Sequence, residues 1–104
     1  MIGEAARRKV LGLVGLGLRG RLAVVGVQQV RDAAKRGRLK IALVAGDASQ
    51  NSLNKITGLL AARSVIVIDS FTAQELGAVT GRDAVAVVGV TDAGLAAGIK
   101  EVVS

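Results

Sequence analysis

The sequence predicts an α/β domain in which a sheet lies between layers of helices. Three short runs, "IALVA" (41–45), "VIVI" (65–68) and "VAVVGV" (85–90), are rich in β-branched residues and almost continuously apolar. Such runs are typical of strands covered on both faces. A weaker run, "LAVV" (22–25), predicts a fourth strand. Because no linker or internal repeat interrupts the pattern, we expect one domain over residues 1–104.

Five other segments have the 3.6-residue periodicity of amphipathic helices. We expect them at residues 4–18, 27–36, 49–62, from 72 and from 93 onward. The apolar residues predicted to face the core are Val10, Leu11, Val14, Val27, Val30, Ala34, Leu53, Ile56, Leu60, Leu76, Val79, Leu95, Ile99 and Val102. The helix at 72 starts with "TAQE", a capping box in which Thr72 caps the helix and Glu75 reaches back to it.

The composition excludes several kinds of chemistry. The chain has no Cys and no His, which removes disulfides, the usual zinc sites, thiol chemistry and imidazole catalysis. It has one Phe and no Tyr or Trp, so bases cannot stack on an aromatic sheet surface. No apolar run approaches the roughly 20 residues of a membrane span, and no signal-peptide pattern is present. We therefore expect a cytoplasmic protein without a cofactor, a metal or a small-molecule substrate.

The positive charge is concentrated in the first part of the chain. Residues 1–40 contain ten basic and two acidic side chains, a net charge of +8, whereas residues 41–104 contain four basic and six acidic ones, a net charge of −2. This asymmetry indicates an anionic partner on one face. Nucleic acid is the commonest such partner, and acidic lipid is its competitor. The alternative to both is a surface whose charge only keeps the protein in solution.

The segment "GLGLRG" (15–20) matches the dinucleotide-binding pattern G-x-G-x-x-G. That pattern requires a strand before it and a helix after it. Here the order is reversed, because a helix precedes the glycines and the strand at 22–25 follows them. The alternative is that the glycines let the first helix pack closely before the chain turns into a strand.

Three aspartates, Asp47, Asp69 and Asp92, each follow a predicted strand. Carboxylates gathered at the carboxyl ends of strands can hold Mg²⁺, which would make the chain a small metal-dependent enzyme. Each aspartate also precedes a predicted helix, where Asp is a preferred cap. Ser49 competes with Asp47 for that cap. We favour the capping interpretation. We also expect that the protein is not an enzyme, because the sequence offers no set of residues that would form a catalytic site.

Two motifs at a fixed separation carry a resemblance to a known family. "R-G-x-x-K-x-A-L-V-A-x-D-A-S-x-N" is followed by "E-L-G-x-x-x-G". This set resembles the kink-turn-RNA-binding ribosomal protein superfamily, and more closely its small bacterial YlxQ-type branch. The similarity covers residues 10–104. The matching residues are Gly15, Leu16, Arg19, Gly26, Arg36, Gly37, Lys40, Asp47, Ala48, Ser49, Asn51, Glu75, Leu76, Gly77, Gly81, Thr91 and Asp92.

The resemblance implies a three-layer α/β/α sandwich with a mixed four-stranded sheet. It also implies a non-enzymatic RNA-binding protein, ribosomal or ribosome-associated, that contacts structured RNA through residues 26–31, 47–49 and 81–84. Amides at the helix start favour phosphate, and the basic residues would attract the RNA backbone. We expect these basic residues to converge with that helix start. The candidate RNA-binding residues are Gly26, Gln28, Gln29, Arg31, Lys35, Arg36, Arg38, Lys40, Asp47 and Arg82.

The first of these segments departs from the family pattern "G-x-N-E-x-x-K". This chain has "G-V-Q-Q-V-R-D", so Gln28 stands for Asn, Gln29 for Glu and Asp32 for Lys. We expect Arg36, four residues after Asp32, to pair with that carboxylate. The resemblance thus implies RNA binding but does not define the RNA or a strict kink-turn specificity. The alternative is a protein-interaction or scaffold domain of the same fold, and we expect the free protein to be monomeric.

Overall fold

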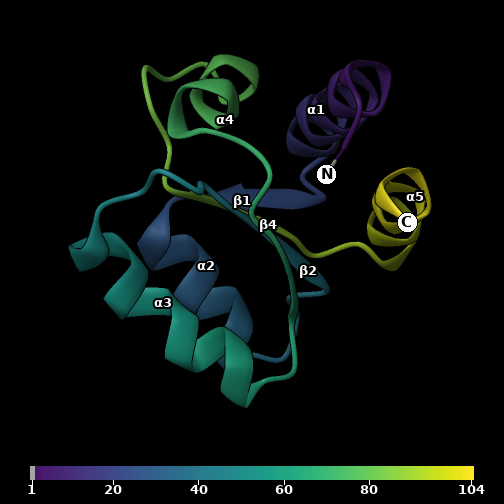
Figure 1. Cartoon of the computed structure of the whole chain (residues 1–104). Helices are drawn as coiled ribbons and strands as arrows, with labels where there is room; N and C mark the ends of the chain where they lie inside the picture. Colours follow the sequence, from purple (N-terminus) through teal and green to yellow (C-terminus); the bar gives the residue numbers. More distant parts are fainter. Residues whose placement is uncertain (1) are drawn as a thin grey trace.

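The computed structural model describes residues 2–104 and contains helices and strands in alternation (Figure 1). Every strand and helix predicted from the sequence is present. The elements are α1 (Glu4–Arg19), β1 (Ala23–Val25), α2 (Val27–Lys35), β2 (Ile41–Val44), α3 (Gln50–Ala62), β3 (Ile66–Ile68), α4 (Ala73–Thr80), β4 (Val87–Val90) and α5 (Ala93–Val103).

The four strands form one mixed sheet in the order β1-β4-β2-β3. Strand β4 runs antiparallel to both of its neighbours, with Val90 opposite Ala23 on one side and opposite Ile41 on the other. Strands β2 and β3 are parallel, with Ile41 opposite Ile66. It follows that β1, β2 and β3 all point the same way, and that their carboxyl ends share one sheet edge with the amino end of β4.

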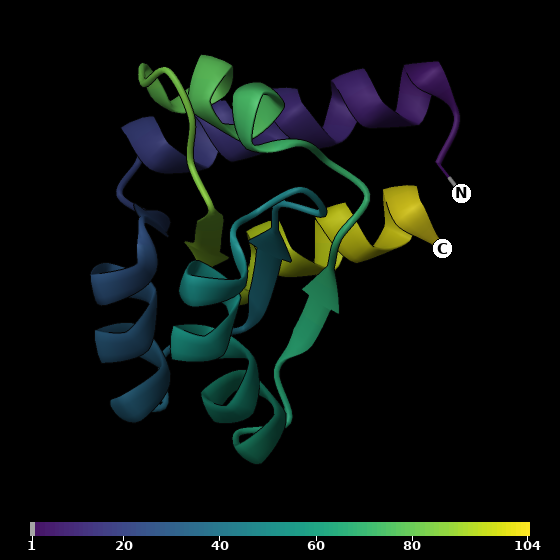
Figure 2. The same cartoon turned by 60° about the vertical axis from the view of Figure 1, so that its left-hand side comes forward.

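Helices cover both faces of the sheet, as the sequence predicts. Helices α1, α4 and α5 lie on one face, and α2 and α3 lie side by side on the other (Figures 1 and 2). Alternate residues of β2 face opposite layers, so Ile41 and Leu43 join the core beneath α1, α4 and α5 while Ala42 and Val44 join the core beneath α2 and α3. No helix within residues 2–104 is long and apolar enough to cross a membrane.

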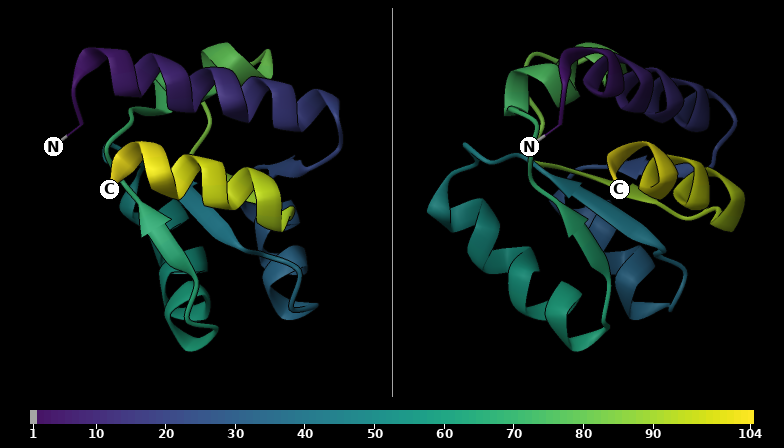
Figure 3. Two further views of the ribbon diagram at one scale, coloured as in Figure 1. Left: turned by 90° about the vertical axis from the view of Figure 1, so that its right-hand side faces the viewer. Right: turned by 45° about the vertical axis from the view of Figure 1, so that its right-hand side comes forward.

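The glycine-rich segment at 15–20 lies in and after the last turn of α1, and one of its glycines has a packing role. A Cβ atom at Gly17 would overlap the side chain of Leu95 on α5. Helices α1 and α5 therefore approach closely because position 17 lacks a side chain, and they lie side by side in both views of Figure 3. This finding supports the packing interpretation of the segment over the dinucleotide one.

Strand β3 contradicts the expectation that "VIVI" is covered on both faces. Ile66 is 49% exposed and Val67 is 45% exposed, and only Ile68 is buried. The physical reason is position: β3 is the last strand in the sheet order and has one neighbour. An apolar run cannot distinguish a central strand from an edge strand, because that distinction depends on pairing between distant segments.

The start of α4 is held by the predicted capping box and by a basic residue from α1. The Thr72 hydroxyl accepts from the Glu75 amide at 3.1 Å, and the Glu75 carboxylate accepts from the Thr72 amide at 3.0 Å. Arg7 pairs with the same carboxylate and donates to the Ser70 carbonyl at 2.6 Å. Its guanidinium lies 4.9 Å from the centre of the Phe71 ring. The Thr72 amide, and after it Arg7, hold the pKa of Glu75 below its ordinary value of 4.5.

We predict that Glu75→Gln lowers the free energy of unfolding at neutral pH by about 1 kcal/mol, because glutamine keeps the cap but loses the charge that pairs with Arg7. A lowered native pKa stabilises the fold above the unfolded value near 4.5, and this stabilisation is lost as the pH falls through the native value. Urea denaturation at several pH values should therefore show the two proteins converging in acid. Glu101→Gln, at an exposed position on α5, should show no such convergence; a constant difference for Glu75→Gln would contradict the prediction.

Candidate nucleic-acid interface

The resemblance implies RNA contact by three segments, at residues 26–31, 47–49 and 81–84. These segments meet where β1, β2 and β3 end and β4 begins, and we call this edge of the sheet the loop edge. Gly26 follows β1, and its amide donates to the carbonyl of Val87, the first residue of β4, at 2.9 Å. Ala45, which follows β2, donates to the Ala86 carbonyl at 2.8 Å. The antiparallel direction of β4 thus brings the third segment beside the first two.

The first segment leaves backbone donors available at the start of α2. Gly26 has φ +95°, a left-handed conformation that a side chain rarely adopts, and it serves as the N-cap. It provides no side-chain acceptor. Helices α3, α4 and α5, by contrast, are capped by Ser49, Thr72 and Asp92. Among the described helices that follow a strand, α2 is the one whose first-turn amides have no side-chain cap, and such amides favour an anion.

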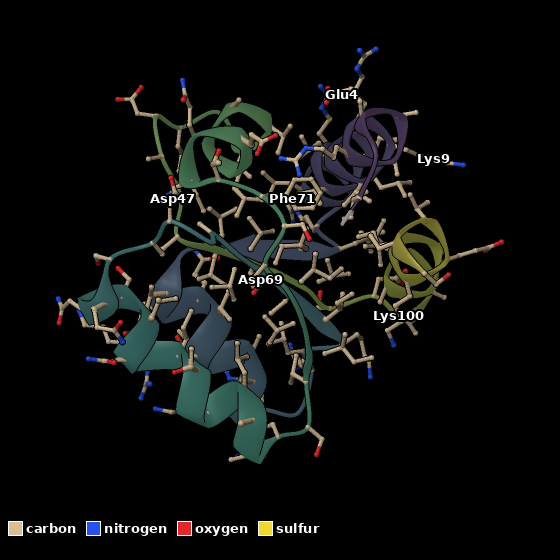
Figure 4. All side chains as sticks on the ribbon, viewed as in Figure 1. Glu4, Lys9, Asp47, Asp69, Phe71 and Lys100 are labelled. Carbon is tan, nitrogen blue, oxygen red and sulfur yellow. The ribbon has the colours of Figure 1, made fainter. Side chains whose placement is uncertain are left out.

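Asp47 orients the second segment by reaching a different helix from the expected one. Its Oδ1 atom accepts from the Ala73 amide, in the first turn of α4, at 2.8 Å. The Gly46 amide donates to the Phe71 carbonyl at 2.9 Å, so two hydrogen bonds tie this loop to the start of α4. Figure 4 shows Asp47 beneath α4. Ser49, and not Asp47, caps α3.

The third segment packs on a glycine of the "E-L-G-x-x-x-G" motif. A Cβ atom at Gly77 would lie 2.7 Å from the Arg82 carbonyl oxygen and 2.8 Å from the Ala84 nitrogen. The Arg82 amide donates to the Gly77 carbonyl at 2.8 Å, after Gly81 ends α4 with φ +75°. The two glycines therefore allow the turn and the close packing that place Arg82, which is exposed, at the loop edge.

The basic residues do not converge on the start of α2 as expected. Arg31 points toward α3 and donates to the Lys55 carbonyl, so its guanidinium is partly engaged within the protein. The other candidate cations lie at or beyond the far end of α2, about 14 Å along the helix from Gly26. These are Lys35, Arg36, Arg38 and Lys40, all exposed. The clustering of basic residues in the sequence does not reveal this separation in space. The nine residues of α2 span the distance from one edge of the sheet to the other.

The expected pairing of Asp32 with Arg36 is absent. The Asp32 Oδ1 atom instead accepts from the Gln28 Nε2 atom at 3.1 Å, and Gln28 is exposed. The ion pairs within residues 2–104 are Arg7–Glu75 and a loose Arg8–Glu4 contact at 3.7 Å. The cations near α2 therefore have no carboxylate partner among the described residues.

The magnesium hypothesis fails on topology. Asp47 and Asp69 follow the parallel strands β2 and β3, but Asp92 follows the antiparallel strand β4 and lies at the opposite edge. There it caps α5 by accepting from the Leu95 amide at 2.8 Å. Within residues 2–104 no group of three or more acidic side chains is placed to hold a metal ion.

A groove beside α2 contains residues that sequence reasoning missed. It lies between α2 and the edge strand β1 and has a volume of about 310 Å³. We call it the arginine groove, lined by Arg21, Val24, Gln29, Asp32, Ala33, Arg36, Arg38 and Thr91. Arg21 and Thr91 were not candidates. In the sequence, Arg21 belongs to the basic first part of the chain, and Thr91 is among the residues that match the family. The place of Thr91 in the groove follows only from the pairing of β4 with β1.

Comparisons with known proteins identify the family. The model of the ribosomal protein L7Ae/L30e/S12e/Gadd45 family matches residues 8–103. The chain belongs to this family. A solved protein of unknown function from Bacillus halodurans C is 27% identical, with a TM-score of 0.82, and the match covers 91% of this chain and 96% of that one. The Giardia lamblia 15.5kD RNA binding protein is 17% identical, with a TM-score of 0.81 and coverage of 99% and 88%. No curated protein matches this chain.

The comparisons confirm the resemblance inferred from the two motifs and the fold class of a sandwich with a mixed sheet. They also confirm that this family member is not an enzyme, a conclusion that rests on the family and not on the absence of a metal.

We predict that Gly77→Ala destabilises the protein by about 1–3 kcal/mol, because backbone atoms of residues 82–84 must move away from the new methyl group. The matched control is Gly58→Ala in α3, where no atom lies within 4 Å and alanine should stabilise the helix by up to about 1 kcal/mol. Urea denaturation of both variants measures the effects. Equal stabilisation by the two substitutions would show that Gly77 does not support the third segment.

Proposed function

We propose that this family member binds structured RNA, ribosomal or ribosome-associated, at the loop edge. The observation that supports the proposal is the meeting of three loop segments around the uncapped start of α2. Amides at a helix start donate to phosphate, and the glycine there allows the RNA backbone to approach. A net charge of +6 adds a long-range attraction for a polyanion.

The chemistry of the loop edge supports recognition of base edges as well as phosphates. Gln28 and Gln29 are exposed in the first turn of α2, and each side-chain amide has both donors and acceptors. Arg82 adds a positive charge on the third segment, and Asp47 borders the site while it holds the second segment in place. We propose that the RNA is kink-turn-like, because three separate loops that surround a helix start suit a sharply bent backbone better than a straight duplex.

The remaining candidate residues would attract the RNA at longer range. These residues are Arg31, Lys35, Arg36, Arg38 and Lys40. Such contacts are sensitive to salt because binding releases counterions. All three loop segments come from one copy of the chain, so the proposed RNA-binding unit is a monomer.

A scaffold role is the second candidate, and one observation favours it. The free edge of β3 exposes Ile66 and Val67 beside unpaired backbone groups, which is a surface that can pair with another strand. A scaffold would bind a protein partner independently of salt and would not retain RNA.

We predict that the double variant Gln28→Ala/Arg82→Ala binds a kink-turn hairpin about tenfold or more weakly than the wild type, because it loses a base contact and a phosphate contact. Dissociation constants would be measured by fluorescence anisotropy at several salt concentrations. The comparison RNA is the same hairpin with its internal bulge deleted. Lys9→Ala is the control, since Lys9 points outward from α1 on the other side of the sheet (Figure 4). Equal binding of both RNAs by the wild type, or equal loss in the double variant and the control, would contradict the proposal.

A further inference from the structure

The free edge of β3 exposes apolar side chains on both faces of the sheet. Strand β3 is the last strand in the sheet order and lies at the margin of the sheet (Figure 2). Ile66 and Val67 are each about half exposed, and because alternate residues of a strand point to opposite faces, one lies on each face. Natural proteins protect such edges with charged residues or proline, but "VIVI" contains neither. The edge therefore has the properties of a strand that pairs with another strand.

An apolar groove continues this edge toward α3. It has a volume of about 420 Å³ and lies between α3 and β3. Leu53 and Leu60 of α3 line it together with Val65 and Val67 at the edge, and Asp69 is its one charged residue. A strand added beside β3 would place its alternate side chains next to Val65 and Val67, and so at the mouth of this groove.

Charged residues are scarce on this side of the molecule. Residues 50–70, which include α3 and β3, contain Lys55, Arg63 and Asp69, a net charge of +1 out of +6 for the whole chain. Two copies of a strongly basic protein repel each other where their basic surfaces meet. The surface formed by α3 and β3 is therefore one through which two copies can approach with little repulsion.

The charges at the two ends of β3 are complementary to those of an identical strand that runs the opposite way. Arg63 precedes β3 and Asp69 follows it. Both are exposed, and neither forms an ion pair within residues 2–104. In an antiparallel pair of β3 strands, the basic end of each strand lies beside the acidic end of the other. A two-fold axis makes this contact twice, whereas a parallel pair would place like charges together.

We propose that β3 pairs in an antiparallel direction with β3 of a second copy of this chain, so that the two sheets join into one. Backbone hydrogen bonds and the burial of Ile66 and Val67 supply the affinity, and the charges at the strand ends fix the direction of pairing. This inference does not rest on RNA binding. It gives the free edge of β3 one specific occupant, and it departs from the expectation that the free protein is monomeric.

The proposed dimer leaves the candidate RNA interface of each copy accessible. Strands β1, β2 and β3 all end at the loop edge. An antiparallel β3 pair therefore places the two loop edges at opposite ends of the joined sheet. Each copy keeps its three loop segments, so one copy remains a complete RNA-binding unit and self-association and RNA binding can be measured separately.

The test measures the mass of the full chain by sedimentation equilibrium over a range of protein concentrations, with circular dichroism to check folding. Val67→Lys places a charge on the exposed edge. Leu16→Lys is the matched control, because Leu16 is 63% exposed on α1, away from β3. Three further variants test the direction of pairing: Arg63→Asp, Asp69→Arg and the double variant Arg63→Asp/Asp69→Arg.

The wild type should rise from the 10.5 kDa of one copy toward twice that mass as its concentration increases. Val67→Lys should raise the dissociation constant of the dimer about tenfold or more, whereas Leu16→Lys should associate as the wild type does. Each single charge variant places like charges together and should also weaken association about tenfold or more. The double variant exchanges the charges, restores the opposite pairing and should recover association.

Several results would overturn the inference. A wild type that keeps the mass of one copy at every concentration would exclude the dimer and leave the edge to a strand of another protein. Equal weakening by Val67→Lys and Leu16→Lys would show nonspecific apolar association, and a double charge variant no better than the single ones would exclude the antiparallel pairing. A wild type that dimerises as described but does not bind a kink-turn hairpin would overturn the proposed function and leave this inference standing.

Discussion

The antiparallel placement of β4 between β1 and β2 is the constraint on which the other features depend. Because β4 pairs with both parallel strands, its amino end lies beside their carboxyl ends. Three loops separated by tens of residues thereby become one surface. The same strand direction sends Asp92 to the opposite edge, where it caps a helix instead of joining Asp47. The direction of β4 therefore creates the loop edge. It also places Asp92 away from Asp47 and Asp69, so these three aspartates do not form the metal site that the sequence suggests.

Backbone groups and small residues hold the loop edge in shape. The loop after β2 is tied to the start of α4 by Asp47 and by the Gly46 amide. The loop before β4 packs directly on Gly77. Arg7 then anchors the α4 start to α1 through Ser70 and Glu75. The consequence is a surface whose loops are held in place by hydrogen bonds and packing within the protein.

Helix α2 contributes to two different surfaces of the protein. Its start contributes free amides at the loop edge, and its outer flank forms one wall of the arginine groove. Its other flank packs on α3, where Arg31 donates to the Lys55 carbonyl. Basic residues on one short helix thus have different roles, because a helix turns by 100° per residue and sends neighbouring side chains to different surroundings.

The sequence by itself determined the helices and strands, the capping box at Thr72 and the family, since periodicity, caps and short motifs are local properties of the chain. Only the tertiary structure decided which strand lies at the edge, where the cations gather and which helix Asp47 reaches. Each of these depends on pairing between residues far apart in the sequence. Ile66 is exposed because β3 has one neighbour, and Arg21 joins Arg36 because β1 and α2 pack side by side. Neither relation can be recognised from the periodicity of the amino-acid sequence.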